Sequence, residues 1–183
     1  EYSMLPYSTT DRARREAQIF QTIGYLSHFV GDAAQPLHVS IHYNGWGDGP
    51  NPKGYSMART IHGSFEGALV RQVVDQARLK AAMTPYVPCG CTVEQMTVRY
   101  LRATNTQVEP LYDLEKAGGL VAGDARGQDF VNRRLAAGAS SLRDMVAEAW
   151  AASANSKVGW PEVSVTDVVS GKVDAYPLLY GQD

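Results

Sequence analysis

The sequence has few cysteines, no long apolar run and no excess of either charge, and each shortage narrows what the chain can be. No stretch approaches the ~20 consecutive apolar residues that a membrane-spanning helix needs. The 17 Lys and Arg against 19 Asp and Glu give a net charge of −2, which disfavours tight binding to duplex nucleic acid through its phosphates. Binding of a single strand in a local cleft stays open.

The two cysteines, Cys89 and Cys91, are separated by one glycine. They lie within disulfide reach if the chain bends, and we expect either a free or a locally oxidised pair in a loop. A redox role normally uses a Cys-x-x-Cys spacing, and a structural zinc site normally needs a second cysteine pair. Two cysteines do not decide the cellular compartment.

The 183 residues, of which 44% are hydrophobic, suit one domain spanning 1–183. Apolar residues recur at steps of three and four, which predicts helices over about 10–31, 57–82, 92–118 and 124–153. Pro110 is expected to kink or split the third helix. The glycines and prolines of 40–56 predict a loop between the first two.

The expected core comes from the apolar faces of these helices. The second helix contributes Ile61, Phe65, Leu69 and Val73, and the fourth contributes Val131, Leu135, Leu142, Met145, Val146, Ala149 and Trp150. The tail 159–183 is expected to be irregular, since Val163–Thr166 could form a short strand but has no evident sheet to join. The sequence therefore predicts an all-α class, a single helical bundle.

All four histidines fall within one window, at positions 28, 38, 42 and 62. Histidine is the commonest metal ligand, and catalytic zinc sites combine it with carboxylates. His28 and Asp32 lie four positions apart, which places both side chains on one face of a helix. His62 and Glu66 repeat this spacing, and His38 lies just beyond the first helix. These five residues are candidate metal ligands.

The same residues allow simpler interpretations. A histidine and a carboxylate four positions apart are often only a hydrogen-bonded surface pair, in which case the chain would be an interaction domain. His42 lies in the glycine-rich loop, where a solvated histidine is the first expectation and a substrate contact the second. Three aromatic residues of this loop either pack on the loop itself or contact a base or a lipid: Tyr43, Trp46 and Tyr55.

Residues 28–38 read HFVGDAAQPLH, which resembles the H-x-x-G-D-x-x-Q-P-[LM]-H signature of a zinc enzyme superfamily. That superfamily contains the bacterial zinc-dependent phospholipases C and the single-strand-specific nucleases. Downstream, residues 62–66 read HGSFE and are similar to its second metal motif, H-x-x-x-[DE]. The resemblance implies packed helices around three zinc ions and a secreted or periplasmic protein, because the relatives act outside the cytoplasm.

By motif position, the resemblance implies that His28 ligates one zinc and that Asp32 bridges two. His38, His62 and Glu66 would hold the remaining zinc, a complete set of three protein ligands with a position left for water. Glu66, where an aspartate is the alternative, is similar to the phospholipase branch. The long loop between His38 and His62 is closer to the nuclease branch but lacks its D-x-G-G-N pattern, so the phospholipase branch is favoured.

The family's other ligands, an N-terminal Trp, two His and an Asp, have no counterpart here, nor has its general base. The chain begins at Glu1 without a signal peptide, and we expect a processed or trimmed product that lacks the family's N-terminal part. The implied activity is zinc-dependent hydrolysis of a phosphodiester, phospholipase C-like, in a phospholipid or a single-stranded nucleic acid. The alternatives are a single-strand nuclease and a metal-binding but inactive product that needs a missing N-terminal segment as its partner.

Overall fold

The computed structural model describes residues 9–174 and 177. It is 62% helix and 2% strand, which confirms the all-α class. Within these ranges no helix combines the length and the apolarity that a membrane crossing requires. The expected domain 1–183 consists of two compact units, one of residues 28–144 and the other of residues 1–27 with 145–183. All five candidate metal ligands belong to the unit 28–144.

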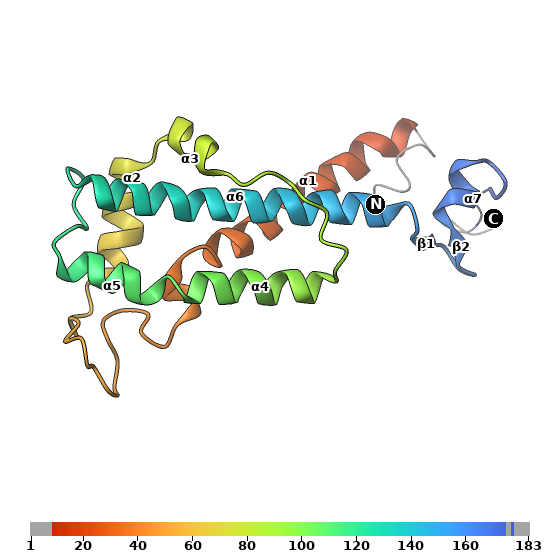
Figure 1. Ribbon diagram of the computed structural model, residues 1–183. Helices are drawn as coiled ribbons and strands as arrows, with labels where there is room; N and C mark the ends of the chain where they lie inside the picture. Colours follow the sequence, from red (N-terminus) through yellow and green to blue (C-terminus); the bar gives the residue numbers. More distant parts are fainter. Residues whose placement is uncertain (1–8, 175–176, 178–183) are drawn as a thin grey trace. The chain divides into compact units, whose positions relative to one another are not determined.

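The unit 28–144 begins in the last turn of one long helix and ends within another. Its elements are the end of α1 (Thr9–Asp32), η2 (Pro36–Val39), η3 (Gly63–Leu69), α2 (Val70–Val73), α3 (Gln76–Ala82), α4 (Val93–Asn105), α5 (Val108–Lys116) and the part of α6 (Ala125–Ser153) up to Asp144. Within this unit α4 and α5 run alongside α6 (Figure 1), and Arg134 of α6 donates a hydrogen bond to Thr104 of α4 at 3.3 Å.

The core of this unit is built on one face of the helical segment that contains η3 and α2. Its four predicted apolar residues are all buried: Ile61, Phe65, Leu69 and Val73. They belong to one cluster with α5 and α6, to which those helices contribute Leu111, Tyr112, Phe130 and Val131. Burial of this face fixes which way the opposite, polar face of the segment points.

The helix predicted over 57–82 is not continuous, which corrects the sequence-based expectation. Residues 57–60 lie outside helix, and η3 is a π-helix in which the Val70 N–H bonds to the Phe65 carbonyl. The chain becomes extended at Val74, and Asp75 then caps α3 by accepting from the N–H groups of the next turn. An aspartate cap offers the backbone an alternative to continued helix, and here it prevails over the apolar periodicity.

Asn132 of α6 holds this break in place. Its side chain is buried, its Oδ1 accepts from the Asp75 N–H at 2.9 Å, and its Nδ2 donates to the Val73 carbonyl at 3.1 Å and the Gln128 carbonyl at 2.8 Å. One amide side chain therefore pairs with two backbone groups at the interruption between α2 and α3, the Val73 carbonyl and the Asp75 N–H. A buried amide whose oxygen and nitrogen both make hydrogen bonds is costly to replace.

We expect Asn132→Asp to lower the free energy of unfolding by about 3 kcal/mol at neutral pH, because a buried carboxylate would then face two carbonyl oxygens. Urea denaturation followed by circular dichroism measures the change. Asn155→Asp, the same substitution at an exposed position, is expected to change it by less than about 0.5 kcal/mol. Equal effects at the two positions would show that Asn132 does not hold the break.

The later helices begin and end close to their predicted limits. Thr92 and Gln95 form the expected capping box at the start of α4. The third predicted helix is split as expected, but the split precedes Pro110, between Asn105 and Val108. Pro110 lies in the first turn of α5, where the missing N–H costs no helical hydrogen bond.

The unit of residues 1–27 and 145–183 contains the start of α1, the end of α6, a hairpin and α7 (Val165–Val169). The tail from 159 is thus not irregular throughout, and the predicted strand does have a partner: β2 (Val163–Ser164) pairs antiparallel with β1 (Lys157–Val158). Ala149 and Trp150 were expected to be buried but are exposed. They line a cavity of about 260 Å³ against α1, so the apolar faces there do not close on each other.

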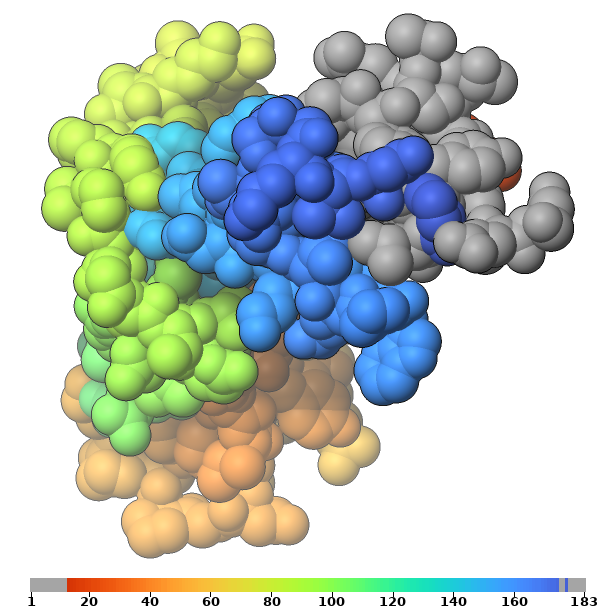
Figure 2. Space-filling model, turned by 90° about the vertical axis from the view of Figure 1, so that its right-hand side faces the viewer, coloured from red at the N-terminus to blue at the C-terminus, as the bar shows by residue number. Residues whose placement is uncertain are grey.

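Cys89 and Cys91 form a disulfide in the segment between α3 and α4. Gly90, at a φ of +58°, supplies the bend that brings the two Cα atoms to 5.1 Å. This segment is largely exposed, and the space-filling view shows it in yellow-green at the surface (Figure 2). The expectation of a local pair in a loop is met by the oxidised form.

Candidate metal centre

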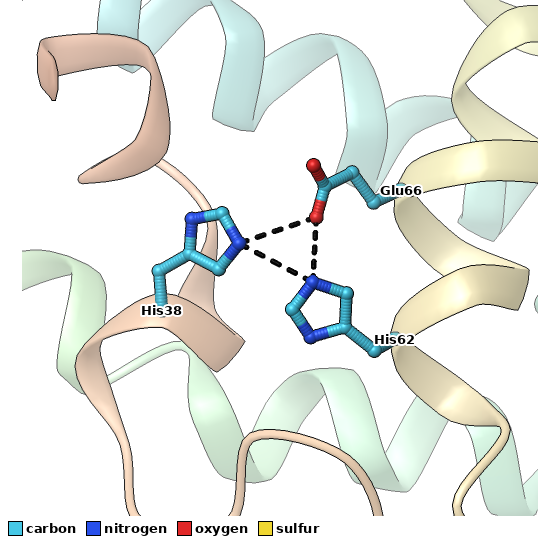
Figure 3. Close-up of side chains that lie close together, drawn as sticks. All are labelled: His38, His62 and Glu66. Carbon is cyan, nitrogen blue, oxygen red and sulfur yellow. Dashed lines mark hydrogen bonds and ion pairs between the residues drawn. The ribbon is translucent and has the colours of Figure 1, made fainter. Parts of the chain in front are cut away.

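Three of the five predicted ligands converge on one point: His38, His62 and Glu66 (Figure 3). The Glu66 Oε2 lies 3.2 Å from the His38 Nε2 and 2.8 Å from the His62 Nε2, and the two nitrogens are 3.3 Å apart. Ligand atoms around a tetrahedral zinc, at bonds of about 2.0–2.1 Å, are separated by about 3.3 Å. The three atoms are therefore spaced as ligands of one small cation would be.

Two short segments position these side chains. Gln35 accepts from the Leu37 N–H at 2.6 Å and so caps η2, which carries His38. His62 and Glu66 are four positions apart in the helical segment 61–73, and Phe65, which lies between them in the sequence, is buried in the core. The core contacts of Phe65 thereby direct the ligand pair away from the core and toward His38.

Backbone carbonyls fix the orientation of both imidazole rings. The His38 Nδ1 lies 3.1 Å from the Asp32 carbonyl, and the His62 Nδ1 lies 2.9 Å from the Tyr43 carbonyl. A carbonyl only accepts, so Nδ1 carries a proton in each ring, and the neutral ring then presents its lone pair at Nε2. This is the arrangement typical of zinc-binding histidines, whose second nitrogen donates to a carbonyl or carboxylate.

The convergence is electrostatically unfavourable without a positive charge between the atoms. With both Nδ1 atoms protonated, two nitrogen lone pairs and a carboxylate oxygen face one another across 3.3 Å or less. Lone pairs cannot hydrogen-bond to one another. A metal ion satisfies all three groups at once, whereas a proton on one imidazole satisfies that ring and the carboxylate oxygen to which it donates.

Glu66 is held as a carboxylate. Burial raises its pKa, but the hydrogen bond from Gln35 Nε2, at 3.3 Å, and the neighbouring His38 and His62 outweigh burial and leave the pKa of Glu66 below its ordinary value. Metal ligation requires the deprotonated group, so this environment favours the ligating form. The donor from Gln35 also fixes the orientation of the carboxylate.

The other two predicted ligands lie outside the converging group. His28 and Asp32 pair on the surface of α1, with 3.3 Å between Nε2 and Oδ2, and the His28 side chain is 70% exposed. The second Asp32 oxygen lies 3.7 Å from the His38 Nδ1. In the described part of the chain, only His38, His62 and Glu66 bring three ligand atoms this close. His28 and Asp32 adjoin the centre without completing a second one.

His42, expected first as a solvated loop histidine, is instead packed. Its ring stacks on Trp46 with 3.8 Å between centroids, and its Nδ1 accepts from the Gly47 N–H at 3.0 Å. Trp46 and Tyr55 are buried in the core, which favours packing on their own loop over contact with a base or a lipid. Tyr43 is exposed and remains available to a ligand.

Sequence reasoning assigned no role to several groups that support the centre. Gln35 lies within the signature at residues 28–38, and its place in that motif is the one feature that could have indicated a role at the centre. Asn44 accepts from the His62 N–H at 3.3 Å through Oδ1, a contact that no sequence pattern indicated. Arg134 lies on α6, almost seventy positions beyond Glu66, and its sequence neighbourhood gives no sign of proximity to the histidines.

A cavity of about 220 Å³ opens beside the centre. Five polar residues border it: Asp32, Gln35, His38, Glu66 and Arg134. The remaining wall is mainly apolar and includes Phe65. Such a combination of convergent polar groups and apolar walls is typical of small-molecule sites.

Comparisons of this chain with known protein families, with curated proteins and with solved structures gave no match.

Proposed function

We propose that the chain is a zinc-dependent hydrolase of phosphodiester bonds, related to the zinc phospholipases C and single-strand-specific nucleases that residues 28–38 resemble. The observation that carries the proposal is the convergence of the Nε2 atoms of His38 and His62 on Glu66 Oε2, within 3.3 Å of one another. Two segments far apart in the sequence supply these atoms. A surface ion pair would require only one of the two histidines.

The donor set suits zinc better than the common alkaline-earth ions. Two imidazoles and one carboxylate are the ligands of several catalytic zinc sites, whereas calcium and magnesium prefer oxygen ligands. Three protein ligands leave the fourth position of a tetrahedral site open. A zinc ion in that place would supply Lewis acidity, lowering the pKa of a water toward neutrality and offsetting charge on phosphoryl oxygens.

The residues of the chain would hold and orient that chemistry. Carbonyls of Asp32 and Tyr43 keep both rings in the ligating tautomer, and Gln35 keeps Glu66 aligned. The favoured reaction is phospholipase C-like hydrolysis, because a glutamate at position 66 is similar to the phospholipase branch of the superfamily. A single-strand nuclease is the second outcome of a substrate test. Export from the cytoplasm is part of the same proposal, since it follows from the resemblance alone.

Zinc analysis of the purified protein tests the metal directly. We expect about one tightly held zinc per chain after dialysis against limiting metal, and a melting temperature that falls by about 5–10 °C when a chelator removes it. The loss follows because zinc binds the folded chain and not the unfolded one. Less than half a zinc per chain, with no change in melting temperature, would remove the metal centre and leave an interaction domain.

Turnover is measured on the same preparations with bis(4-nitrophenyl) phosphate, a generic phosphodiester. Zinc-dependent release of nitrophenol supports the proposal. Zinc binding without turnover would instead identify a metal-binding chain that needs further ligands from another segment. A short-chain phosphatidylcholine and single-stranded DNA then distinguish the two substrate classes.

A further inference from the structure

Arg134 is a cation that forms no ion pair within the described part of the chain. Burial lowers its pKa, and the positive charge of the adjacent Arg133 lowers it further, whereas Tyr100 partly offsets the effect. Buried charges in proteins are normally paired, because an unpaired one pays the full cost of leaving water.

The guanidinium of Arg134 has N–H groups that make no hydrogen bond to the described residues. Its Nε donates to the Ala34 carbonyl at 3.0 Å and its Nη2 to the Thr104 Oγ1 at 3.3 Å. The Nη1 group makes no hydrogen bond to the described residues. Among the described residues, Oε2 of Glu115 is the one side-chain nitrogen or oxygen that is both fully buried and without a hydrogen-bond partner. Because Nη1 of Arg134 lacks a partner and is not in this class, it is not fully buried. Two contacts therefore fix the plane of the group and leave the N–H groups of Nη1 free for a ligand.

The location of this group gives it a function. Arg134 lines the same cavity as His38 and Glu66 of the metal centre. We infer that Arg134 binds an oxyanion, a phosphoryl group of the substrate, that enters this cavity and reaches the metal centre with its other oxygens. The inference rests on the proposed phosphodiester activity and names the residue that recognises the anionic part of the substrate.

The chemistry of both partners agrees with this assignment. A guanidinium presents a planar fork of donors that matches the spacing of phosphate oxygens, and its hydrogen bonds strengthen where water is excluded. Asp32 and Glu66 border the cavity and would repel an anion, but a divalent cation at the centre offsets their charge. With those carboxylates neutralised, Arg134 is the remaining charge that an entering anion meets.

A purely structural role would use only the two contacts already made. The bonds to Ala34 and Thr104 tie the turn after α1 and the helix α4 to α6, and glutamine at position 134 can still donate one of them. Arg134→Gln therefore removes the charge and the free donors while keeping a polar tether. Its neighbour Arg133 offers a matched control, because it is exposed and pairs with Asp129 at 2.7 Å.

The test is a calorimetric titration of inorganic phosphate into zinc-loaded and zinc-free protein, with the zinc content measured in each sample. We expect Arg134→Gln to weaken phosphate binding about 10- to 100-fold and to leave the zinc content unchanged. Arg133→Gln is expected to change it less than about two-fold. Equal phosphate affinities for the wild type and Arg134→Gln overturn the inference.

The zinc measurement separates this inference from the proposed function. If the chain holds no zinc, the proposed function fails, yet the zinc-free titration still reports whether Arg134 binds phosphate. If zinc is held and Arg134→Gln binds phosphate like the wild type, only the assignment of Arg134 is lost. Phosphate that fails to bind the wild type in either form also overturns it.

If Arg134→Gln does not fold, a measurement on the unaltered chain tests the inference instead. Phenylglyoxal modifies accessible arginines, and mass spectrometry locates the adducts. Phosphate is expected to slow modification of Arg134 at least five-fold and to leave Arg133 unchanged, and unchanged rates at both contradict the inference. Dihexanoylphosphatidylcholine and a thymidine dinucleotide, used as protectants, tell a lipid phosphate from a nucleic-acid phosphate.

Discussion

Replacing His62 by alanine is expected to abolish stoichiometric zinc binding and, with it, hydrolysis of a generic phosphodiester. His62 supplies one of three ligand atoms, and its Nε2 lies 2.8 Å from the Glu66 oxygen that would share the ion. Changing groups that merely orient a metal ligand typically costs 10- to 100-fold in affinity, so loss of a ligand should cost more than about 100-fold. Equilibrium dialysis with zinc measures the affinity, and nitrophenol release from bis(4-nitrophenyl) phosphate measures activity.

The control replaces a nearby histidine that has a packing role. His42→Asn places an amide oxygen where Nδ1 accepts from Gly47, so the loop keeps that hydrogen bond. We expect this variant to keep its zinc, although it loses the stack on Trp46. Retained zinc and retained hydrolysis in His62→Ala would show that the centre is wrongly assigned.

The second large effect is expected at Gly45, in the loop that orients His62. Gly45 has a φ of +92°, and a Cβ built there would lie 2.7 Å from the Met57 carbonyl oxygen and 2.8 Å from that of Ala58. Both obstacles are backbone, so alanine forces the loop to move. We expect Gly45→Ala to lower the free energy of unfolding by about 2–4 kcal/mol and zinc affinity by about 10- to 100-fold.

Gly45 affects zinc affinity through the two residues that precede it. Tyr43 and Asn44, the two residues before Gly45, hold the His62 ring and its backbone N–H. Movement of Gly45 shifts both contacts, and the imidazole loses the carbonyl that selects its tautomer. Urea denaturation and zinc dialysis on one preparation measure the two effects together.

Two neighbouring glycines serve as matched controls. Gly49 also has a positive φ, +133°, but a Cβ there meets no atom within 4 Å, so Gly49→Ala isolates the backbone strain. At Gly47 the nearest atoms lie at 3.7 Å, an ordinary contact, and alanine should be close to neutral. If Gly45→Ala is no worse than Gly47→Ala, the close approach to Met57 and Ala58 does not constrain the loop.

Local patterns predicted the helices well because their causes are local. The capping box at Thr92 and Gln95 and the buried periodicity of Ile61 to Val73 each depend on residues a few positions apart. The break at Val74 escaped prediction, since its partner Asn132 lies far along the chain. Trp150 escaped it for a similar reason, because periodicity says which face is apolar and not whether another helix covers it.

The centre shows the same division. Spacing places His62 and Glu66 on one helical face, and the resemblance of residues 28–38 to a zinc-enzyme signature added His38, so all three residues were predicted from the sequence. The spacing of His28 and Asp32 is identical, yet that pair remains on the surface of α1. What separates the two pairs is whether a third ligand from another segment reaches them. The position of Arg134 could not be predicted for the same reason, since only the packing of α6 brings this residue to the cavity.

The π-helical geometry of η3 means that this segment holds about one residue more than an α-helix with the same total turn would. Bonds such as that from Val70 N–H to Phe65 O span five residues, and the segment accommodates more chain per turn than an α-helix does. Deleting one residue between Gly63 and Leu69 would let it relax to the α form. Because an α-helix turns more per residue than a π-helix, the shortened segment would pass through nearly the same total angle, and the residues before the deletion would keep nearly the same orientation against Val70–Val73. A one-residue deletion that removes neither a ligand nor a core residue should therefore leave His62 close to its present direction.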